Sequence, residues 1–112
     1  MEEKILNSIN KIVTICKLQN KEININNYKK DKIIEINNNI IIQYNEKLIM
    51  LRINDANEDY IDYCNNENIK YKKYLYYLET KRIHHVDIYV YDISIFNKIL
   101  QFIVNHSLWT YI

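Results

Sequence analysis

The sequence predicts an α+β domain in which an antiparallel sheet of about five to six strands packs against an N-terminal and a C-terminal helix. Three observations lead to this prediction. Apolar residues recur with helical period near both ends of the chain, and β-branched residues dominate between them. The strand-like segments also lie too close together for the long crossovers that parallel pairing needs. The 112 residues suit a single domain, 1–112, with one core.

The two terminal helices are predicted over residues 2–19 and 93–106. Glu2 and Glu3 lie where acidic side chains stabilise the positive end of a helix dipole, and Asp92 is a suitable N-cap for the second helix. Each helix has one apolar stripe. The stripes consist of Ile5, Leu6, Ile9, Ile12, Val13 and Cys16 in the first helix, and Ile95, Phe96, Ile99, Leu100 and Ile103 in the second. We expect both stripes to cover one face of the sheet.

Between these helices, β-branched residues indicate strands near 22–26, 32–36, 40–44 and 47–53. Asparagine-containing breaks separate the strands, at 27–30, 37–39 and 45–46. The chain contains no glycine and no proline. A tight hairpin needs positive φ, and asparagine is the next best residue for it after glycine. We therefore interpret these asparagines as turn residues rather than as a functional tract.

The second half of the chain leaves more alternatives open. The segment 54–68 is polar, and it fits either a short helical turn anchored by Tyr60, Ile61 and Tyr63 or a loop. Residues 69–79 fit a strand or a helix, and the clear alternation in 83–91 favours a strand that pairs with it in a hairpin turning at 80–82. The apolar tail 108–112 is expected to pack on the core, add an edge strand or dock on a partner.

The composition is unusual. Isoleucine, asparagine, lysine and tyrosine together supply 64 of the 112 residues, and Ala56 is the only alanine. The codons of those four residues consist mostly of A and T, so the composition indicates an AT-rich genome, such as that of a virus, a phage, or a low-GC bacterium or protist. A segment rich in tyrosine or asparagine therefore carries less functional weight here than it would in an average protein.

Charge and cysteine content narrow the class of protein. The formal net charge of +1 provides no global field toward nucleic acid or a membrane. Cys16 and Cys64 match no metal-binding spacing, and we expect both to be buried free thiols. No apolar run reaches the roughly 18 residues of a transmembrane helix, and the polar N-terminus does not resemble a signal peptide. We therefore expect a cytoplasmic protein with no cofactor and no membrane partner.

One group of residues could carry chemistry. On a strand, His85 and Asp87 would point the same way, as would Tyr89 and Tyr91. A histidine–carboxylate pair is one half of an acid/base group or of a metal site. However, the sequence shows no third ligand at a characteristic spacing, no nucleophile motif and no glycine-rich phosphate loop. We therefore predict neither catalytic residues nor a metal site, and interpret these side chains as the exposed face of a strand.

The solvent side of the predicted hairpin is the candidate binding surface. Tyrosine offers a large contact area with few rotors, so we predict that this surface binds a protein partner. The predicted contact residues are Lys70, Lys72, Tyr74, Tyr76, His85, Tyr89 and Tyr91. The same residues could instead bind single-stranded nucleic acid, with rings stacking on bases and ammonium groups neutralising phosphates.

Two further features bear on partners. The acidic stretch 55–67 directly precedes the basic stretch 70–82, and each could contact a charged partner, or the two could pair with one another. In the tail, Trp109 and Tyr111 could contact a partner or a second copy, which makes a homodimer or a self-associating structural protein a third alternative. Together with the composition, these features predict a small non-enzymatic accessory protein, such as a viral or mobile-element inhibitor of a host or defence factor.

Overall fold

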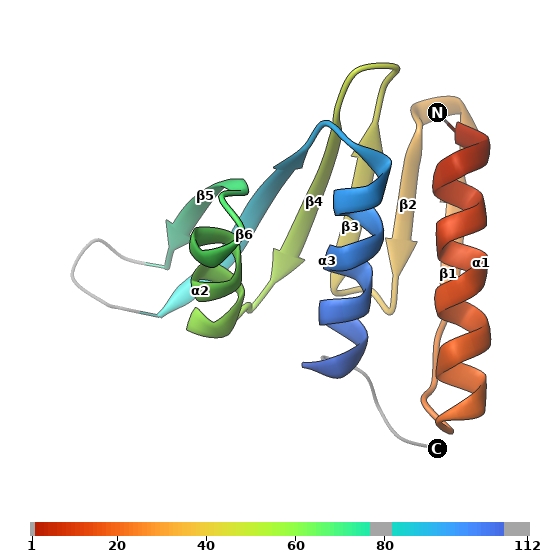
Figure 1. Cartoon of the computed structure of the whole chain (residues 1–112), viewed down its shortest axis with the longest axis horizontal. Coiled ribbons are helices and arrows are strands. Elements are labelled where there is room, and N and C mark those ends of the chain that lie inside the picture. The colour runs from red at the N-terminus through yellow and green to blue at the C-terminus, as the bar shows by residue number, and fades with distance from the viewer. Residues whose placement is uncertain (1, 77–81, 107–112) are drawn as a thin grey trace.

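Three helices, six strands and one short 3-10 helix follow one another in the computed structural model, which describes residues 2–76 and 82–106 (Figure 1). The helices are α1 (Glu2–Leu18), α2 (Glu58–Asn66) and α3 (Ile93–Asn105). The strands are β1 (Ile25–Tyr28), β2 (Ile33–Ile36), β3 (Ile40–Tyr44), β4 (Ile49–Asn54), β5 (Lys70–Leu75) and β6 (Ile83–Val90). The 3-10 helix η1 (Lys29–Asp31) joins β1 to β2.

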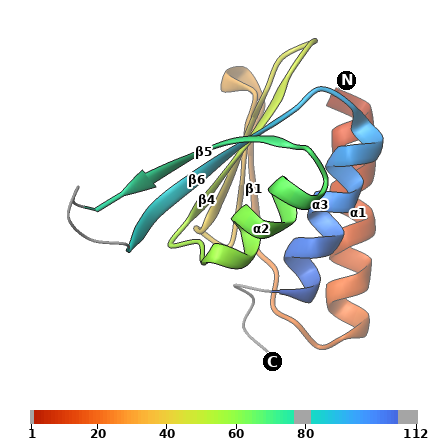
Figure 2. The same ribbon diagram turned by 60° about the vertical axis from the view of Figure 1, so that its left-hand side comes forward.

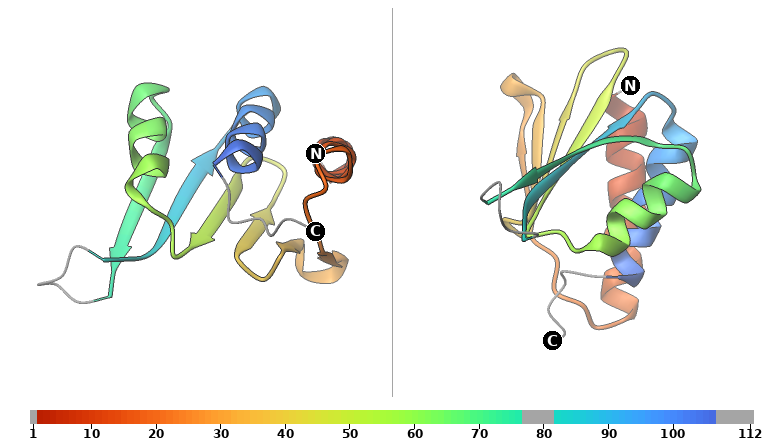
Figure 3. Two further views of the ribbon diagram at one scale, coloured as in Figure 1. Left: turned by 90° about the horizontal axis from the view of Figure 1, so that it is seen from below. Right: turned by 90° about the vertical axis from the view of Figure 1, so that its left-hand side faces the viewer.

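All six strands belong to one antiparallel sheet, in the order β1-β2-β3-β4-β6-β5. The three helices form a layer on a single face of this sheet (Figures 2 and 3). Within the layer α1 contacts α3, and α2 packs over the β5–β6 end. Two packed layers around one core confirm the predicted α+β class and the antiparallel sheet covered by an N-terminal and a C-terminal helix.

The core explains why these segments form these elements. Alternate residues of the central strands face the helices and are buried: Ile34, Ile36, Ile40, Ile42, Ile49, Leu51, Ile53, Val86, Ile88 and Val90. The helices complete the core with Ile5, Ile9, Ile12 and Cys16 of α1 and with Phe96, Ile99, Leu100, Ile103 and Val104 of α3. Because a one-residue slip would turn all inward side chains of a strand outward, this pattern fixes the register of the sheet.

The sequence left open whether 54–68 forms a helical turn or a loop, and the structure shows that this segment contains helix α2. It is a helix of nine residues, and Asn57 caps it by accepting a hydrogen bond from the Asp59 amide, N···O 3.0 Å. Tyr60, Ile61 and Cys64 are buried, whereas Tyr63 is only half-buried. The third buried anchor of this helix is therefore Cys64, at i+4 from Tyr60, and not Tyr63. Both cysteines are buried free thiols, as expected.

Several predicted boundaries need correction. The first strand spans Ile25–Tyr28 rather than 22–26. The residues that follow it, Lys29–Asp31, form η1, and Lys32 adopts the left-handed conformation, with φ 54°.

Residues 77–81, which include most of the predicted turn, lie outside the described residues. So does the tail from residue 107, and with it Trp109 and Tyr111. Among the residues that are described, no helix is long and apolar enough to cross a bilayer.

Asparagine does supply positive φ in one tight turn. Asn37 and Asn38, between β2 and β3, have φ values of 52° and 59°, and the amide of Asn39 donates to the carbonyl of Ile36. Positive φ at both central residues defines a type I′ turn, whose twist matches that of the flanking strands. The turn after β3 works differently, because the Asn45 side chain accepts hydrogen bonds from the amides of Lys47 and Leu48.

Replacement by glycine should be tolerated in the first of these two turns but should destabilise the second. Replacing Asn38 by Ala should lower the free energy of unfolding by about 1 kcal/mol, because Ala has a Cβ and no compensating side-chain bond in the left-handed region, whereas Asn38→Gly should cost nothing. At Asn45 the side chain makes the turn, so Asn45→Gly should itself cost about 1 kcal/mol. Urea unfolding followed by circular dichroism would measure all three. Equal losses for Gly and Ala at Asn38 would contradict the role assigned to φ.

Candidate interaction face

The sheet face opposite the helices has no element packed on it within the described part of the chain (Figures 2 and 3). The strand register arranges its side chains in cross-strand rows. One row consists of Asn26, Glu35, Ile41, Arg52, Asp87 and Lys72. The next consists of Tyr28, Ile33, Gln43, Met50, Tyr89 and Lys70. We call this surface the open face; five of the seven predicted contact residues, Lys70, Lys72, Tyr74, His85 and Tyr89, lie on its strands.

A β-bulge in β6 shapes one end of the open face. Tyr74 pairs with His85 but Leu75 pairs with Ile83, so His84 is an extra residue in the ladder. Ile83 and Val86 are both buried, and the Nδ1 atoms of His84 and His85 approach to 2.7 Å. Simple alternation of side chains along the strand predicted that, of these two histidines, only His85 points to the open face. The bulge instead brings two adjacent imidazoles together at this end of the open face.

Aromatic rings and cations form a cluster along the β5–β6 pair. Tyr74 stacks on His85 with ring centroids 4.3 Å apart, and Tyr76 contacts His84 at 4.7 Å. Three cations lie over three phenol rings, at distances from the centroid of 5.8 Å, 5.1 Å and 4.6 Å. These pairs are Lys70 with Tyr89, Lys72 with Tyr74, and Arg82 with Tyr76.

Two predicted contact residues lie just beyond the strands rather than on them. Tyr76 follows the end of β5, and its hydroxyl donates a hydrogen bond of 2.7 Å to Oδ1 of Asp55. Tyr91 follows the end of β6 and is 62% exposed. Together with Tyr89 and Lys70, Tyr91 lines a hollow of about 260 Å³ at the opposite end of the hairpin. The predicted residues thus span the full length of the β5–β6 pair.

Asp87 is not the exposed carboxylate that its place on an amphipathic strand predicted. Its side chain is 3% exposed, and both carboxylate oxygens accept hydrogen bonds from Arg52, Nε···Oδ1 at 2.8 Å and Nη2···Oδ2 at 3.0 Å. This hydrogen-bonded pair raises the pKa of Arg52 above its usual range. Sequence reasoning missed the pair because the partners are 35 residues apart and only the β4–β6 register brings them together.

His85 does not form the acid/base pair considered from the sequence. The carboxylate of Asp87 is engaged by Arg52, and among the described residues Nε2 of His85 is buried without a hydrogen-bond partner. Burial lowers the pKa of His85, and the charges of Arg52 and His84 lower it further, partly offset by Asp87. The surroundings of His85 therefore favour its neutral form over its charged form. No cluster of three or more potential metal ligands occurs in 2–76 and 82–106.

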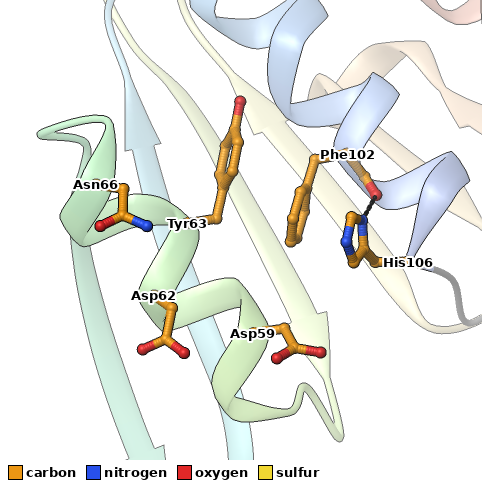
Figure 4. A pocket seen from close by; sticks show the side chains of 6 residues that line it. All are labelled: Asp59, Asp62, Tyr63, Asn66, Phe102 and His106. Carbon is orange, nitrogen blue, oxygen red and sulfur yellow. Dashed lines mark hydrogen bonds between the residues drawn. The ribbon is translucent and has the colours of Figure 1, made fainter.

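A second hollow, of about 270 Å³, lies on the helical side of the molecule, between α2 and α3 (Figure 4). One wall is a row of stacked rings in which Phe102 lies between Tyr63 and His106, with centroid distances of 4.2 Å and 4.0 Å. Nδ1 of His106 donates to the carbonyl of Phe102, and Asp59 and Asp62 lie at the rim. Because the ring faces are stacked on one another, we assign this row to the packing of α2 against α3.

Comparison with known proteins identifies no family for this chain. The chain matches no protein family model, no curated protein and no solved structure.

Proposed function

We propose that the protein is a small non-enzymatic binding protein that presents its open face to an acidic surface of a protein partner. The observation that carries this proposal is the preorganised cluster of rings and cations on β5 and β6. Rings held by stacking and by cations have few conformations left to lose, so less entropy opposes binding. Tyrosine and arginine are also the residue types that most often anchor protein interfaces.

Charge complementarity supports an acidic partner. Arg52 is neutralised by Asp87. Lys70, Lys72 and Arg82 make no ion pair with any described residue, and their cationic groups lie over exposed or half-exposed rings. The cluster therefore has an excess of positive charge although the whole chain is nearly neutral. Such a local field steers and orients an acidic partner more than it adds raw affinity.

Protein is favoured over single-stranded nucleic acid by two features of the same face. Bases would need free ring faces to stack on, but each of the three phenol rings already has a cation over it, and Tyr74 also stacks on His85. The open face also continues into Ile33, Ile41 and Met50, and includes the carboxylate of Glu35. Apolar groups mixed with both signs of charge suit a protein interface better than a phosphate backbone.

The composition extends this proposal to an accessory role. An AT-rich coding sequence fits a virus or a mobile element, and on this ground we propose a host or defence protein as the partner.

Site-specific photocrosslinking would test the open face in cells that make the protein. A photoreactive amino acid would replace Tyr74 or Tyr89, and a matched control would carry it at Lys98, which is exposed on α3. We expect an adduct with one acidic protein from the two face positions and none from Lys98. The purified partner should then bind at least tenfold more weakly to the Lys70→Glu/Lys72→Glu variant. Lys11→Glu/Lys98→Glu, with the same change in net charge on the helical side, should bind normally.

The other outcomes would each contradict the proposal. Adducts that a nuclease removes would assign the face to nucleic acid instead. Adducts between two copies of the chain would assign it to self-association. Equal labelling from Lys98 and from the face positions, or no adduct from the face, would show that the open face is not the contact surface.

A further inference from the structure

We propose that His84 and His85 share one proton across the β6 bulge and form a pH-sensitive latch, which opens when both imidazoles become charged and so changes the Tyr76 end of the open face. The latch would regulate the proposed binding surface. That consequence rests on the proposed function, whereas the shared proton does not.

The distance between the two rings requires a single proton between them. Nδ1 of His84 lies 2.7 Å from Nδ1 of His85, which is hydrogen-bonding distance for two nitrogens. A neutral imidazole has one N–H and one bare nitrogen, so one ring donates at Nδ1 and the other accepts. With no proton between them, two lone pairs would face each other. With two, both nitrogens would be donors and could not form the bond.

The bulge makes this contact a built feature of the strand. In a regular strand, adjacent residues point to opposite faces of the sheet. Here Ile83 and Val86 are both buried, and the two intervening histidines lie together on the open face. Tyr74 holds His85 from one side by stacking, and Tyr76 contacts His84. The amide of Asp55 also donates to the carbonyl of His84, N···O 2.9 Å, which fixes the backbone at the extra residue.

The surrounding charges make a doubly charged pair unfavourable. Lys72 of β5, which lies over Tyr74, and Arg82, which precedes β6, bring positive charge to this end of the face. The carboxylates nearby are already engaged, Asp87 by Arg52 and Asp55 by the hydroxyl of Tyr76. Two imidazolium rings 2.7 Å apart would therefore repel one another, and no carboxylate of the described residues forms an ion pair with either ring.

Protonation of the pair should therefore occur in two coupled steps. A first additional proton can enter while one N–H still lies between the rings, and such a charge-assisted bond is stronger than a neutral one. The second additional proton would place an N–H on both facing nitrogens. The bond must then break, and the exposed His84 ring moves away and leaves its contact with Tyr76. The lowered pKa of His85 agrees with a late second step.

Imidazole NMR of the free protein tests the latch without any partner. Titration from pH 8 to 4.5 should give two separate steps for the pair, with His85 protonated in the later one. The ring signals of Tyr76 should shift in that same step. In His84→Thr, which keeps a strand-forming residue but removes the second ring, His85 should titrate in one step at higher pH. In His106→Gln, which removes the histidine that follows α3, the two steps of the pair should be unchanged.

Three results would overturn the latch. They are independent titration of the two histidines, an unchanged titration of His85 in His84→Thr, and Tyr76 signals that do not follow the second step. None of them would affect the crosslinking result, and loss of crosslinking would leave the titration intact. The two proposals can therefore fail separately.

Discussion

Replacing Arg52 by methionine is expected to lower the free energy of unfolding by about 3 kcal/mol. Asp87 is 3% exposed, and its two carboxylate oxygens accept hydrogen bonds from this one guanidinium. Methionine has a similar length but no donor, so it would leave a buried carboxylate without a counter-charge. We expect the lower end of the usual range, because Arg52 is 39% exposed and water can reach the site. Urea unfolding at pH 7 would measure the loss.

The cost of breaking this pair should depend on which partner is removed. Asp87→Val leaves Arg52 free to extend into solvent, so it should cost clearly less than Arg52→Met. The double variant Arg52→Met/Asp87→Val removes both charges and should recover most of the stability, because an apolar pair of similar volume replaces a buried ion pair at little cost. If Arg52→Met lost under about 1 kcal/mol, the carboxylate of Asp87 would not depend on Arg52.

Raising the pH from 8 to 11 should destabilise the protein by about 3–4 kcal/mol through two buried side chains of α2. Burial raises the pKa of Cys64 from 9.0 to about 11, and burial together with the charge of Asp59 raises the pKa of Tyr60 from 10.0 to about 12. Both groups are uncharged in the folded state and lose their protons first in the unfolded chain. The unfolded state therefore binds fewer protons above pH 9, and stability falls as the pH rises through this range.

Two substitutions separate these groups from the rest of the chain. The Tyr60 hydroxyl is buried without a hydrogen-bond partner among the described residues, so Tyr60→Phe should cost nothing at pH 7 or stabilise slightly. Cys64→Ala should cost about 1 kcal/mol at pH 7 through lost packing. Urea midpoints at pH 8, 9.5 and 11 should fall much less steeply in the double variant. A residual slope should remain, because burial also raises the pKa of Tyr44 and Tyr63. An unchanged slope would contradict the assignment to Tyr60 and Cys64.

The interaction face could be only partly predicted from the sequence. Alternation along β6 placed His85 and Tyr89 on one side, and the strand alternative for 70–75 placed Lys70, Lys72 and Tyr74 beside them. A prediction from regular alternation contains no bulge. It therefore pointed His84 toward the core and left Tyr76 within the strand. A bulge leaves no periodic signal of its own, because it results from a mismatch between two strands rather than from either sequence.

The sequence by itself determined the helices at both ends, the antiparallel strands and the apolar face that each element buries. These properties follow from side-chain period and backbone preference, which act over a few residues. The tertiary structure decided that β6 lies between β4 and β5, that Arg52 meets Asp87, and that His84 and His85 face one another. Each of these contacts depends on the register between strands distant in the chain. That register is set by packing the whole sheet against the helices, which no local pattern encodes.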